Sequence, residues 1–164
     1  MTAAARLAIV AALAFLAWSG WTYSQAEQAD GDDIGQARDL VLRTGQRQVA
    51  VLNSMTWTQS DAGLRQWQDV STGPLRERLV REAPGSEQQI VKARTTATAT
   101  VDDAALTALD VRAGSARLIA TVQIRLTPPN GAPAVQRKRY EAGLARTPGG
   151  WKLTSLTAIP VSAR

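Results

Sequence analysis

Residues 116–127, with the sequence ARLIATVQIRLT, decide the class of the fold. From Leu118 to Leu126 every second side chain is apolar, whereas the positions between them carry Thr, Gln and Arg, with Ile119 as the exception. A period of two is typical of a strand that has one buried face and one solvated face. The stretch therefore predicts a strand in an antiparallel sheet that is covered on one side only.

The sequence on both sides of this strand continues in the same way. Threonine and alanine alternate at residues 94–101, a composition that favours strands over helices. The turn-forming sequences PPNG at 128–131 and PGG at 148–150 precede the later apolar runs, and we expect Asn130-Gly131 to supply positive φ angles. We therefore expect a curved antiparallel sheet of about five strands. The expected strands are residues 94–101, 105–112, 116–127, 135–147 and 151–159.

Three helices are expected ahead of the strands. Apolar residues recur every three or four positions over residues 34–55, which is the spacing of a helix with one buried face. Gly45 lies inside this helix at a cost of about 1 kcal/mol relative to alanine, and it marks either a close packing contact or an incidental glycine. Two shorter helices are expected at 60–70 and 75–82, and Pro84-Gly85 should end the second. Helices followed by strands predict an α+β domain with the helices packed on one face of the sheet.

An uncharged apolar block precedes these elements. No residue from Leu7 to Ala26 is charged, and a helix of about 20 residues is just long enough to cross a hydrocarbon core of about 30 Å. The aromatic residues Trp18, Trp21 and Tyr23 stand at its far end, and such rings prefer the headgroup boundary of a bilayer. The block therefore predicts a transmembrane anchor with an aromatic boundary.

Charges flank this block asymmetrically. Arg6 precedes it, and four acidic residues follow within residues 27–33. Because basic residues favour the cytoplasmic side, we expect the N-terminus inside the cell and the rest of the chain outside the membrane. The expected organisation is a short cytoplasmic N-terminus at 1–6, a single-pass transmembrane anchor at 7–26, an acidic linker at 27–33, an extracytoplasmic domain at 34–161 and a tail at 162–164.

A cleaved signal peptide is the alternative for the same block. Ser24-Gln25-Ala26 offers a cleavage site of the small-x-small type. Bulky Trp21 and Tyr23 lie close to that site and argue against cleavage, so we favour the retained anchor. Both interpretations export the residues that follow Glu27.

The composition excludes several classes of chemistry. The 164 residues include no cysteine and no histidine, which excludes disulfides, thiolate metal sites and nucleophile systems built on histidine. The acidic cluster at residues 30–33 lacks the spacing of a calcium loop, and there is no Gly-rich phosphate loop. The formal charge is +5, from 19 Lys and Arg against 14 Asp and Glu, but no aromatic-rich basic platform indicates nucleic acid. We therefore expect no catalytic residue, no cofactor, no metal ion and no nucleic-acid partner.

Three helices followed by a curved sheet resemble the cone of the nuclear transport factor 2-like superfamily. Three stretches carry a more specific resemblance, to the Mce-associated membrane proteins of actinobacteria, which combine one N-terminal anchor with such a domain. These stretches are VLNSMTW at 51–57, the Thr72-Gly73 break before Leu75 and Leu79, and RKRY at 137–140 followed by GWKL at 150–153. The resemblance implies an accessory or scaffold protein of an Mce-type lipid import complex in the cell envelope.

We therefore expect a non-catalytic, membrane-anchored scaffold that acts through protein partners and has a lipid as a further candidate ligand. Three alternatives stay open. The chain could be a VirB8-like component of a conjugation or secretion channel, or a lipid-binding module that uses the cone. It could also be an isomerase-like enzyme, in which Tyr140 would act with Asp110 or Asp61; we favour structural roles for these three residues.

Two groups of residues are candidates for binding. Alternation places Arg137 and Arg139 on one face of their strand and Lys138 on the other, so the basic run is not a single cluster. A solvated sheet face is the simplest interpretation of the arginines, and docking of a partner is the functional one. The candidate docking residues are Arg117, Arg125, Arg137 and Arg139, and the candidate pocket-lining residues are Trp57, Trp67, Tyr140 and Trp151.

Overall fold

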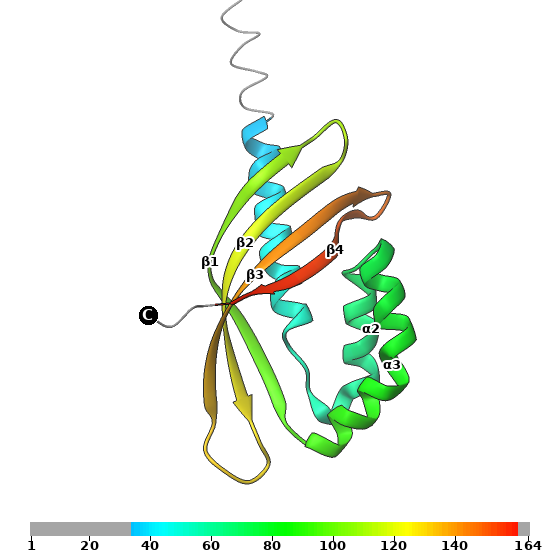
Figure 1. The fold of residues 1–164 in the computed structure, drawn as a ribbon, viewed down its shortest axis with the longest axis vertical. Coiled ribbons are helices and arrows are strands. Elements are labelled where there is room, and N and C mark those ends of the chain that lie inside the picture. The colour runs from blue at the N-terminus through cyan, green and yellow to red at the C-terminus, as the bar shows by residue number, and fades with distance from the viewer. Residues whose placement is uncertain (1–33, 161–164) are drawn as a thin grey trace, which may run out of the picture. The chain divides into compact units, whose positions relative to one another are not determined.

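The computed structural model describes residues 34–160. Helices come first in the chain and strands follow, which confirms the predicted α+β class (Figure 1). The first helix covers residues 34–52. The later elements are η1 (Trp57–Gln59), α2 (Ser60–Asp69), α3 (Gly73–Ala93), β1 (Thr96–Asp110), β2 (Ser115–Thr127), β3 (Ala134–Thr147) and β4 (Gly150–Ile159).

The predicted anchor at 7–26 and linker at 27–33 lie outside the described residues. The same holds for Trp18, Trp21 and Tyr23, so their place at a membrane boundary stays a prediction. Within residues 34–160, no helix is both long enough and apolar enough to cross a membrane.

The four strands form an antiparallel meander in the order β1-β2-β3-β4. On β2, Leu118, Ala120, Val122 and Ile124 are buried, which confirms the alternation read from the sequence. Ile119 points to the opposite face, where its side chain is 38% exposed. The register places Ala120 opposite Tyr140, so the buried residues of β3 share the inner face of the sheet.

The prediction of about five strands is wrong, because two of the expected strands are one. Residues 94–101 and 105–112 fall within the single strand β1. Its pairing with β2 shifts register between Val101 and Asp103 and again between Leu106 and Ala108. A β-bulge inserts an extra residue and disturbs the alternation without ending the strand. The broken pattern in the sequence therefore reflects bulges and not a turn.

The turns also differ from expectation in one detail. Gly131 has a φ of 134° and Gly150 a φ of 97°, so both turns depend on the conformational freedom of glycine. Asn130 does not adopt a positive φ, since Arg94 is the only non-glycine residue among those described that does.

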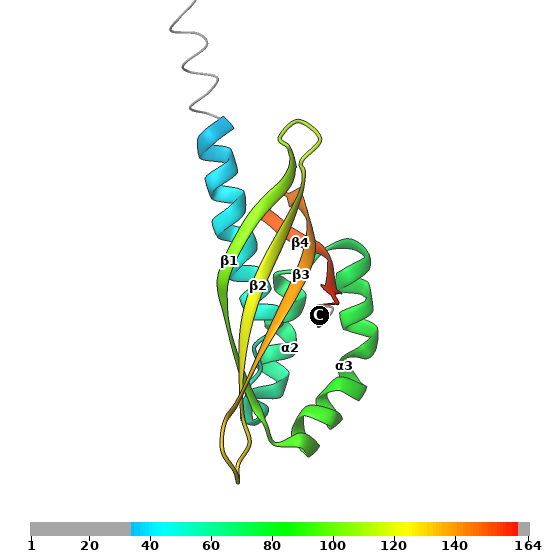
Figure 2. The ribbon, with the colours of Figure 1, turned by 60° about the vertical axis from the view of Figure 1, so that its left-hand side comes forward.

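The hydrophobic core lies between the inner face of the sheet and the helices. Figures 1 and 2 show the helices on one side of the sheet, with no helix on the other side. Val41 and Val49 of the first helix are fully buried, together with Leu118 and Leu153 of the sheet. Gly45 lies between the two valines and has Leu118 and Leu144 as its nearest neighbours, so the first helix approaches the sheet closely at this glycine.

Polar contacts hold the helices to the strands. The buried Gln48 side chain donates a hydrogen bond from Nε2 to the carbonyl oxygen of Trp151, which ties the first helix to β4. Its Oε1 atom has no hydrogen-bond partner within residues 34–160. Each outer strand of the sheet is also bridged once by a connecting segment, at Met55 with Ala97 and at Ser71 with Leu153.

Helix α3 is longer than predicted. Pro84-Gly85 does not end it, because the helix continues to Ala93 and is closed by Arg94 in the left-handed conformation. A proline inside a helix cannot donate to the carbonyl four residues earlier, which here belongs to Val80. The axis of α3 bends midway along its length in Figure 2, as expected for a helix that contains a proline.

Candidate functional site

The face of the sheet that is turned away from the helices, which we call the outer face, carries all four predicted docking arginines. Arg117 and Arg125 alternate with the buried residues of β2 and so point outward. The register places Arg139 opposite Thr121 and Arg137 opposite Gln123, which puts both on the same face. The sequence therefore predicted correctly which arginines share a face, although their binding of a partner stays a prediction.

The outer face is not uniformly basic. Arg117 lies 3.3 Å from Glu141, and Arg137 lies 3.8 Å from Asp102 on β1. All four of these side chains are well exposed, and such ion pairs contribute about 0 to 1 kcal/mol to stability. Their effect here is to neutralise part of the basic charge, so half of the predicted docking residues already have acidic neighbours.

Arg139 differs from these two arginines. Within residues 34–160 it lies in no salt bridge, and the same is true of Asp103 on β1. The register aligns Asp103, Thr121 and Arg139 in one row across three strands. Acidic charge therefore stands on β1 and basic charge on β3, with uncharged side chains on β2 between them.

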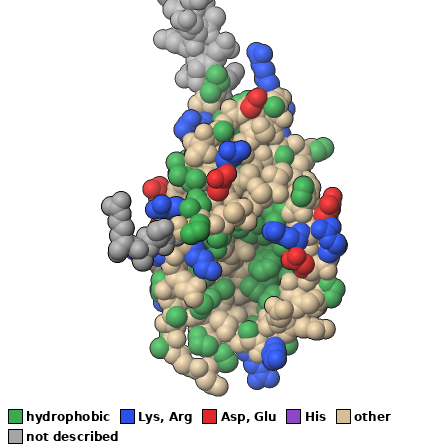
Figure 3. Space-filling view, viewed as in Figure 1, with side chains coloured by type: hydrophobic (Ala, Val, Ile, Leu, Met, Phe, Trp, Pro, Cys, Tyr) green, Lys and Arg blue, Asp and Glu red, His purple; other side chains and the backbone are tan. Residues whose placement is uncertain are grey.

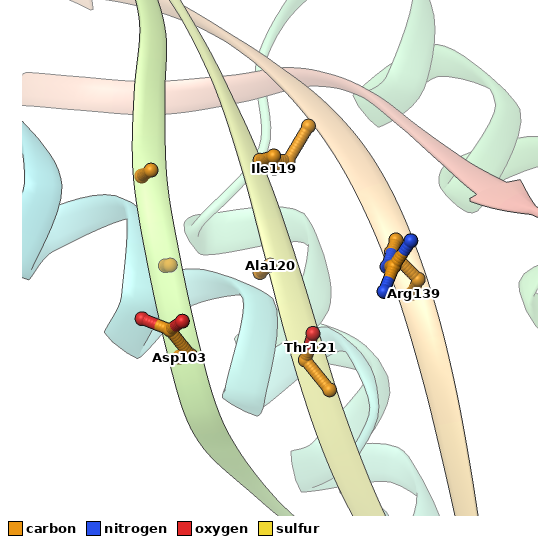
Figure 4. Close-up of a pocket in the computed structure, with 7 residues that line it drawn as sticks. Asp103, Ile119, Ala120, Thr121 and Arg139 are labelled. Carbon is orange, nitrogen blue, oxygen red and sulfur yellow. The ribbon is translucent and has the colours of Figure 1, made fainter.

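A shallow depression of about 300 Å³ lies on this part of the outer face. Asp103 and Arg139 stand at its two sides, and Ile119 and Thr121 lie between them (Figure 4). The remaining lining consists of alanines. The depression combines one acid, one base and one exposed apolar side chain, an arrangement suited to contact with a folded partner.

The four predicted pocket-lining aromatic residues lie in four different elements, η1, α2, β3 and β4. Tyr140 and Trp151 are part of the hydrophobic core. Trp57 lies half-buried in η1, and Trp67 lies half-buried on α2. Figure 3 shows a hollow between β4 and the pair α2 and α3, with hydrophobic side chains in its floor.

Trp67 has a structural role of its own. Its Nε1 donates to the carbonyl oxygens of Val51 at 2.9 Å and Ser54 at 3.0 Å. Val51 lies in the last turn of the first helix and Ser54 just beyond it, and the Val51 carbonyl also accepts from the backbone N–H of Ser54. Trp67 therefore closes that end and joins it to α2.

Replacing Trp67 with phenylalanine should lower the free energy of unfolding by about 1–3 kcal/mol, because the Ser54 carbonyl loses its donor and the Val51 carbonyl keeps only the backbone N–H of Ser54. Urea denaturation would measure the change. Trp57→Phe is the matched control, since the Trp57 indole makes no hydrogen bond within residues 34–160, and it should change stability less. Equal losses in the two variants would contradict the role assigned to the Trp67 indole.

Tyr140, Asp110 and Asp61, the residues considered for an isomerase-like enzyme, lie in different surroundings. Tyr140 is buried, and this burial raises the pKa of its phenol above the usual value. Asp110 accepts a hydrogen bond from the backbone N–H of Ala113 in the β1–β2 turn, and Asp61 forms an exposed ion pair with Arg65 on α2. Asp110 pairs with Ser115 and Tyr140 with Ala120. Five residues of strand span about 17 Å, so Asp110 and Tyr140 do not meet.

The described part of the chain also offers no cluster of metal ligands. No group of three acidic side chains within residues 34–160 is placed to hold an ion. The sequence did not point to Asp102 and Asp103, because these residues fell between two expected strands. Their relation to the arginines becomes visible only with the register of β1.

No family model matches the sequence, and no curated protein matches it. Several solved structures share its fold. An IcmL-like type IV secretion system protein from Legionella pneumophila is 13% identical, with 77% of this chain and 95% of that chain covered and a TM-score of 0.64. The VirB8 homologue CagV from Helicobacter pylori is 14% identical, with 76% and 99% covered and a TM-score of 0.60. The periplasmic domain of DotI is 11% identical, with 74% and 94% covered and a TM-score of 0.62.

None of these three structures is an Mce-associated protein, so that resemblance gains no support from them. At identities of 11–14% the likeness concerns the fold. The domain is an α+β fold with three helices on a four-stranded antiparallel sheet, and its fold is similar to that of these secretion-system proteins.

Proposed function

We propose that the chain is a membrane-anchored, non-catalytic assembly component of a secretion or conjugation channel, comparable to VirB8. The observation that carries this proposal is the combination of the fold with what precedes it. The domain aligns over 95% or more of two type IV secretion proteins, and an uncharged apolar block stands ahead of it in the sequence. A tethered domain has a high effective concentration near membrane partners, which suits assembly.

The absence of catalysis is part of the proposal. It is supported by the lack of cysteine and histidine in the chain and by the separation of Tyr140 from Asp110. It is further supported by the character of the outer face, whose depression is shallow and open and contains one acid, Asp103. Such a surface can recognise a protein but cannot shield a reacting group from water.

The location of the domain can be tested by reporter fusions. Alkaline phosphatase joined after residue 160 should be active, because this enzyme folds outside the cytoplasmic membrane, whereas a cytoplasm-dependent fluorescent reporter at the same position should stay dark. The chain should also stay in the membrane fraction after alkaline extraction. The opposite reporter pattern would contradict the proposed location, and release by alkali would favour a cleaved leader over the anchor.

The partners can be identified from the producing organism. Cross-linking in intact cells, followed by purification of the full chain in mild detergent, should recover subunits of an envelope-spanning secretion or conjugation channel. Recovery of lipid-import subunits instead would replace the secretion role with the Mce role. Recovery of neither set, with the chain alone in the detergent, would contradict an assembly role of any kind.

A further inference from the structure

We propose that the β2–β3 hairpin binds an extended acidic segment of a partner protein, which adds as a strand to the part of β3 that runs beyond β4. The site is the edge of β3 from Ala134 to Lys138 on the side away from β2, which we call the open edge. The binding mode holds whether or not the chain serves a secretion channel.

β3 is longer than the strand that pairs with it on this side. Its pairing with β2 extends as far as Ala134, which lies opposite Leu126. β4 ends earlier, at Ile159, which lies opposite Arg139. Figures 1 and 2 show the β2–β3 hairpin continuing past the end of β4. Within residues 34–160, no strand or connecting segment pairs with the open edge.

The backbone of the open edge carries hydrogen-bonding groups that β2 does not use. Alternate residues of an antiparallel strand direct their N–H and C=O groups to opposite neighbours. The N–H of Gly143 points toward β4, where it donates to the Ser155 hydroxyl. Because β3 pairs with β2 without a register shift, the same alternation directs the backbone groups of Val135 and Arg137 to the open edge. These two residues offer two donors and two acceptors to an added strand.

A strand can reach the open edge without displacing a helix. Val122 and Ile124 on β2 are buried, but their neighbours Lys138 and Gln136 on β3 are exposed. Every residue from Ala134 to Arg139 is exposed. The cover that the helices give to the inner face of the sheet therefore stops short of this part of β3.

The charge of the hairpin favours an acidic partner. The sequence from Gln123 to Arg139 contains four basic residues and no acidic residue. Arg137 lies 3.8 Å from Asp102 on β1. Lys138 and Arg139 form no salt bridge within the described range 34–160. Basic side chains beside a strand edge repel a second copy of that edge and attract an acidic strand.

An acidic strand uses both features of the hairpin. An anionic lipid headgroup would match the basic side chains but would leave the carbonyl groups of the open edge to water. A second copy of the hairpin would pair the backbone groups but would place basic side chains against each other. In strand addition, main-chain hydrogen bonds supply affinity and the alternate side chains supply specificity.

The geometry fixes the design of a probe peptide. In an antiparallel pair, a residue directly opposite Arg137 that exchanges both backbone hydrogen bonds with it also points its side chain to the same face. A glutamate at that position therefore meets the Arg137 side chain, and its own N–H faces β3. The N–H groups of the residues on either side of this glutamate face away. A peptide in which glutamate and threonine alternate should thus bind through the N–H groups of its glutamates.

The test is fluorescence anisotropy of this peptide, labelled with a dye, against the full chain in detergent. Methylation of the glutamate nitrogens should weaken binding by about tenfold or more, because the donors that face β3 are lost. Methylation of the threonine nitrogens should have little effect. A peptide with lysine in place of glutamate should also bind about tenfold less tightly. No binding of the unmodified peptide, equal effects of the two methylations, or equal binding of the lysine peptide would overturn the proposal.

Val135→Pro tests the same hydrogen bonds from the side of the chain. The N–H that proline removes faces the open edge, so the pairing with β2 keeps its hydrogen bonds. Binding of the glutamate peptide should fall by about tenfold, whereas the matched control Val135→Thr should bind as the parent chain does. Circular dichroism checks folding. Full binding by a folded Val135→Pro variant would contradict strand addition.

Charge reversal decides if the proline variant does not fold. Arg137→Glu should weaken binding of the glutamate peptide and strengthen binding of the lysine peptide. Arg117→Glu is the matched control, because Arg117 also has an acidic neighbour on the outer face but lies far from the open edge. It should change neither affinity. Equal effects of the two reversals would show that the peptide recognises overall charge and would overturn the proposal.

Removal of residues 161–164 distinguishes a partner from the chain's own end, since a strand continued from β4 would reach the same edge. The shortened chain should bind the glutamate peptide as the full chain does. Binding only after this removal would assign the open edge to the chain's own end and overturn the role of a partner. Co-purification of channel subunits is measured separately, so the strand site and the assembly role can fail independently.

Discussion

Replacing Gly45 with alanine is expected to lower the free energy of unfolding by about 2 kcal/mol, although alanine normally stabilises a helix. A methyl group at this position would overlap Cδ2 of Leu118 and lie 3.4 Å from Cδ2 of Leu144. Leu118 is fully buried within the core, so it has little room to move away. The first helix must then withdraw from the sheet, and the loss of packing should exceed the helical gain.

Gly85 provides the matched control for this prediction. It also lies inside a helix, α3, but a methyl group there would meet nothing within 4 Å. Gly85→Ala should therefore raise stability by about 0.5–1 kcal/mol. Combining Gly45→Ala with Leu118→Val should cost less than the sum of the two single changes, as urea denaturation would show. A stabilising Gly45→Ala would mean that the helix does not approach the sheet closely here.

Replacing Gln48 with glutamate should make the domain strongly dependent on pH. Gln48 is buried and donates to the Trp151 carbonyl, and a protonated glutamate can make the same hydrogen bond. Burial penalises the charged carboxylate, so the pKa of the new side chain should be higher in the folded state than its unfolded value of about 4.3. Stability should then be close to that of the parent chain below pH 4 and should fall as pH rises toward the folded pKa, by about 3 kcal/mol at pH 7.

Gln48→Leu separates the effect of charge from the loss of the hydrogen bond. It removes the donor to Trp151 but also removes Oε1, which has no partner within residues 34–160. Its effect should therefore be small and nearly the same at every pH. The measurement is thermal unfolding of both variants between pH 4 and 8. A loss in Gln48→Glu that does not vary with pH would show that this side chain reaches water.

The fold class could be predicted from the sequence because apolar and polar residues alternate along β2 from Leu118 to Ile124, with Ile119 as the one exception. The length of β1 could not be predicted, because its two bulges shift the alternation of buried and exposed residues at Asp102 and again near Thr107. Alternation identifies a strand only while the pairing is regular. Pro84 misled the reading of α3, since this proline bends the helix and does not end it.

The candidate site was predictable in part. Alternation alone indicated that Arg117, Arg125, Arg137 and Arg139 share a face, because each strand has a fixed period. Which acids stand beside them could not be known, since this depends on how β1 aligns with β2. Gly45 is a further example, because only the position of Leu118 beneath the helix shows that the glycine is required.

The bridges at Met55 with Ala97 and at Ser71 with Leu153 have a consequence for how copies of the chain can associate. Unpaired outermost strands recruit further strands and can grow into open-ended fibres. By occupying a part of each rim with its own connecting segments, the chain reduces the length available for such polymerisation. Open-ended association of copies through the sheet edges is therefore disfavoured.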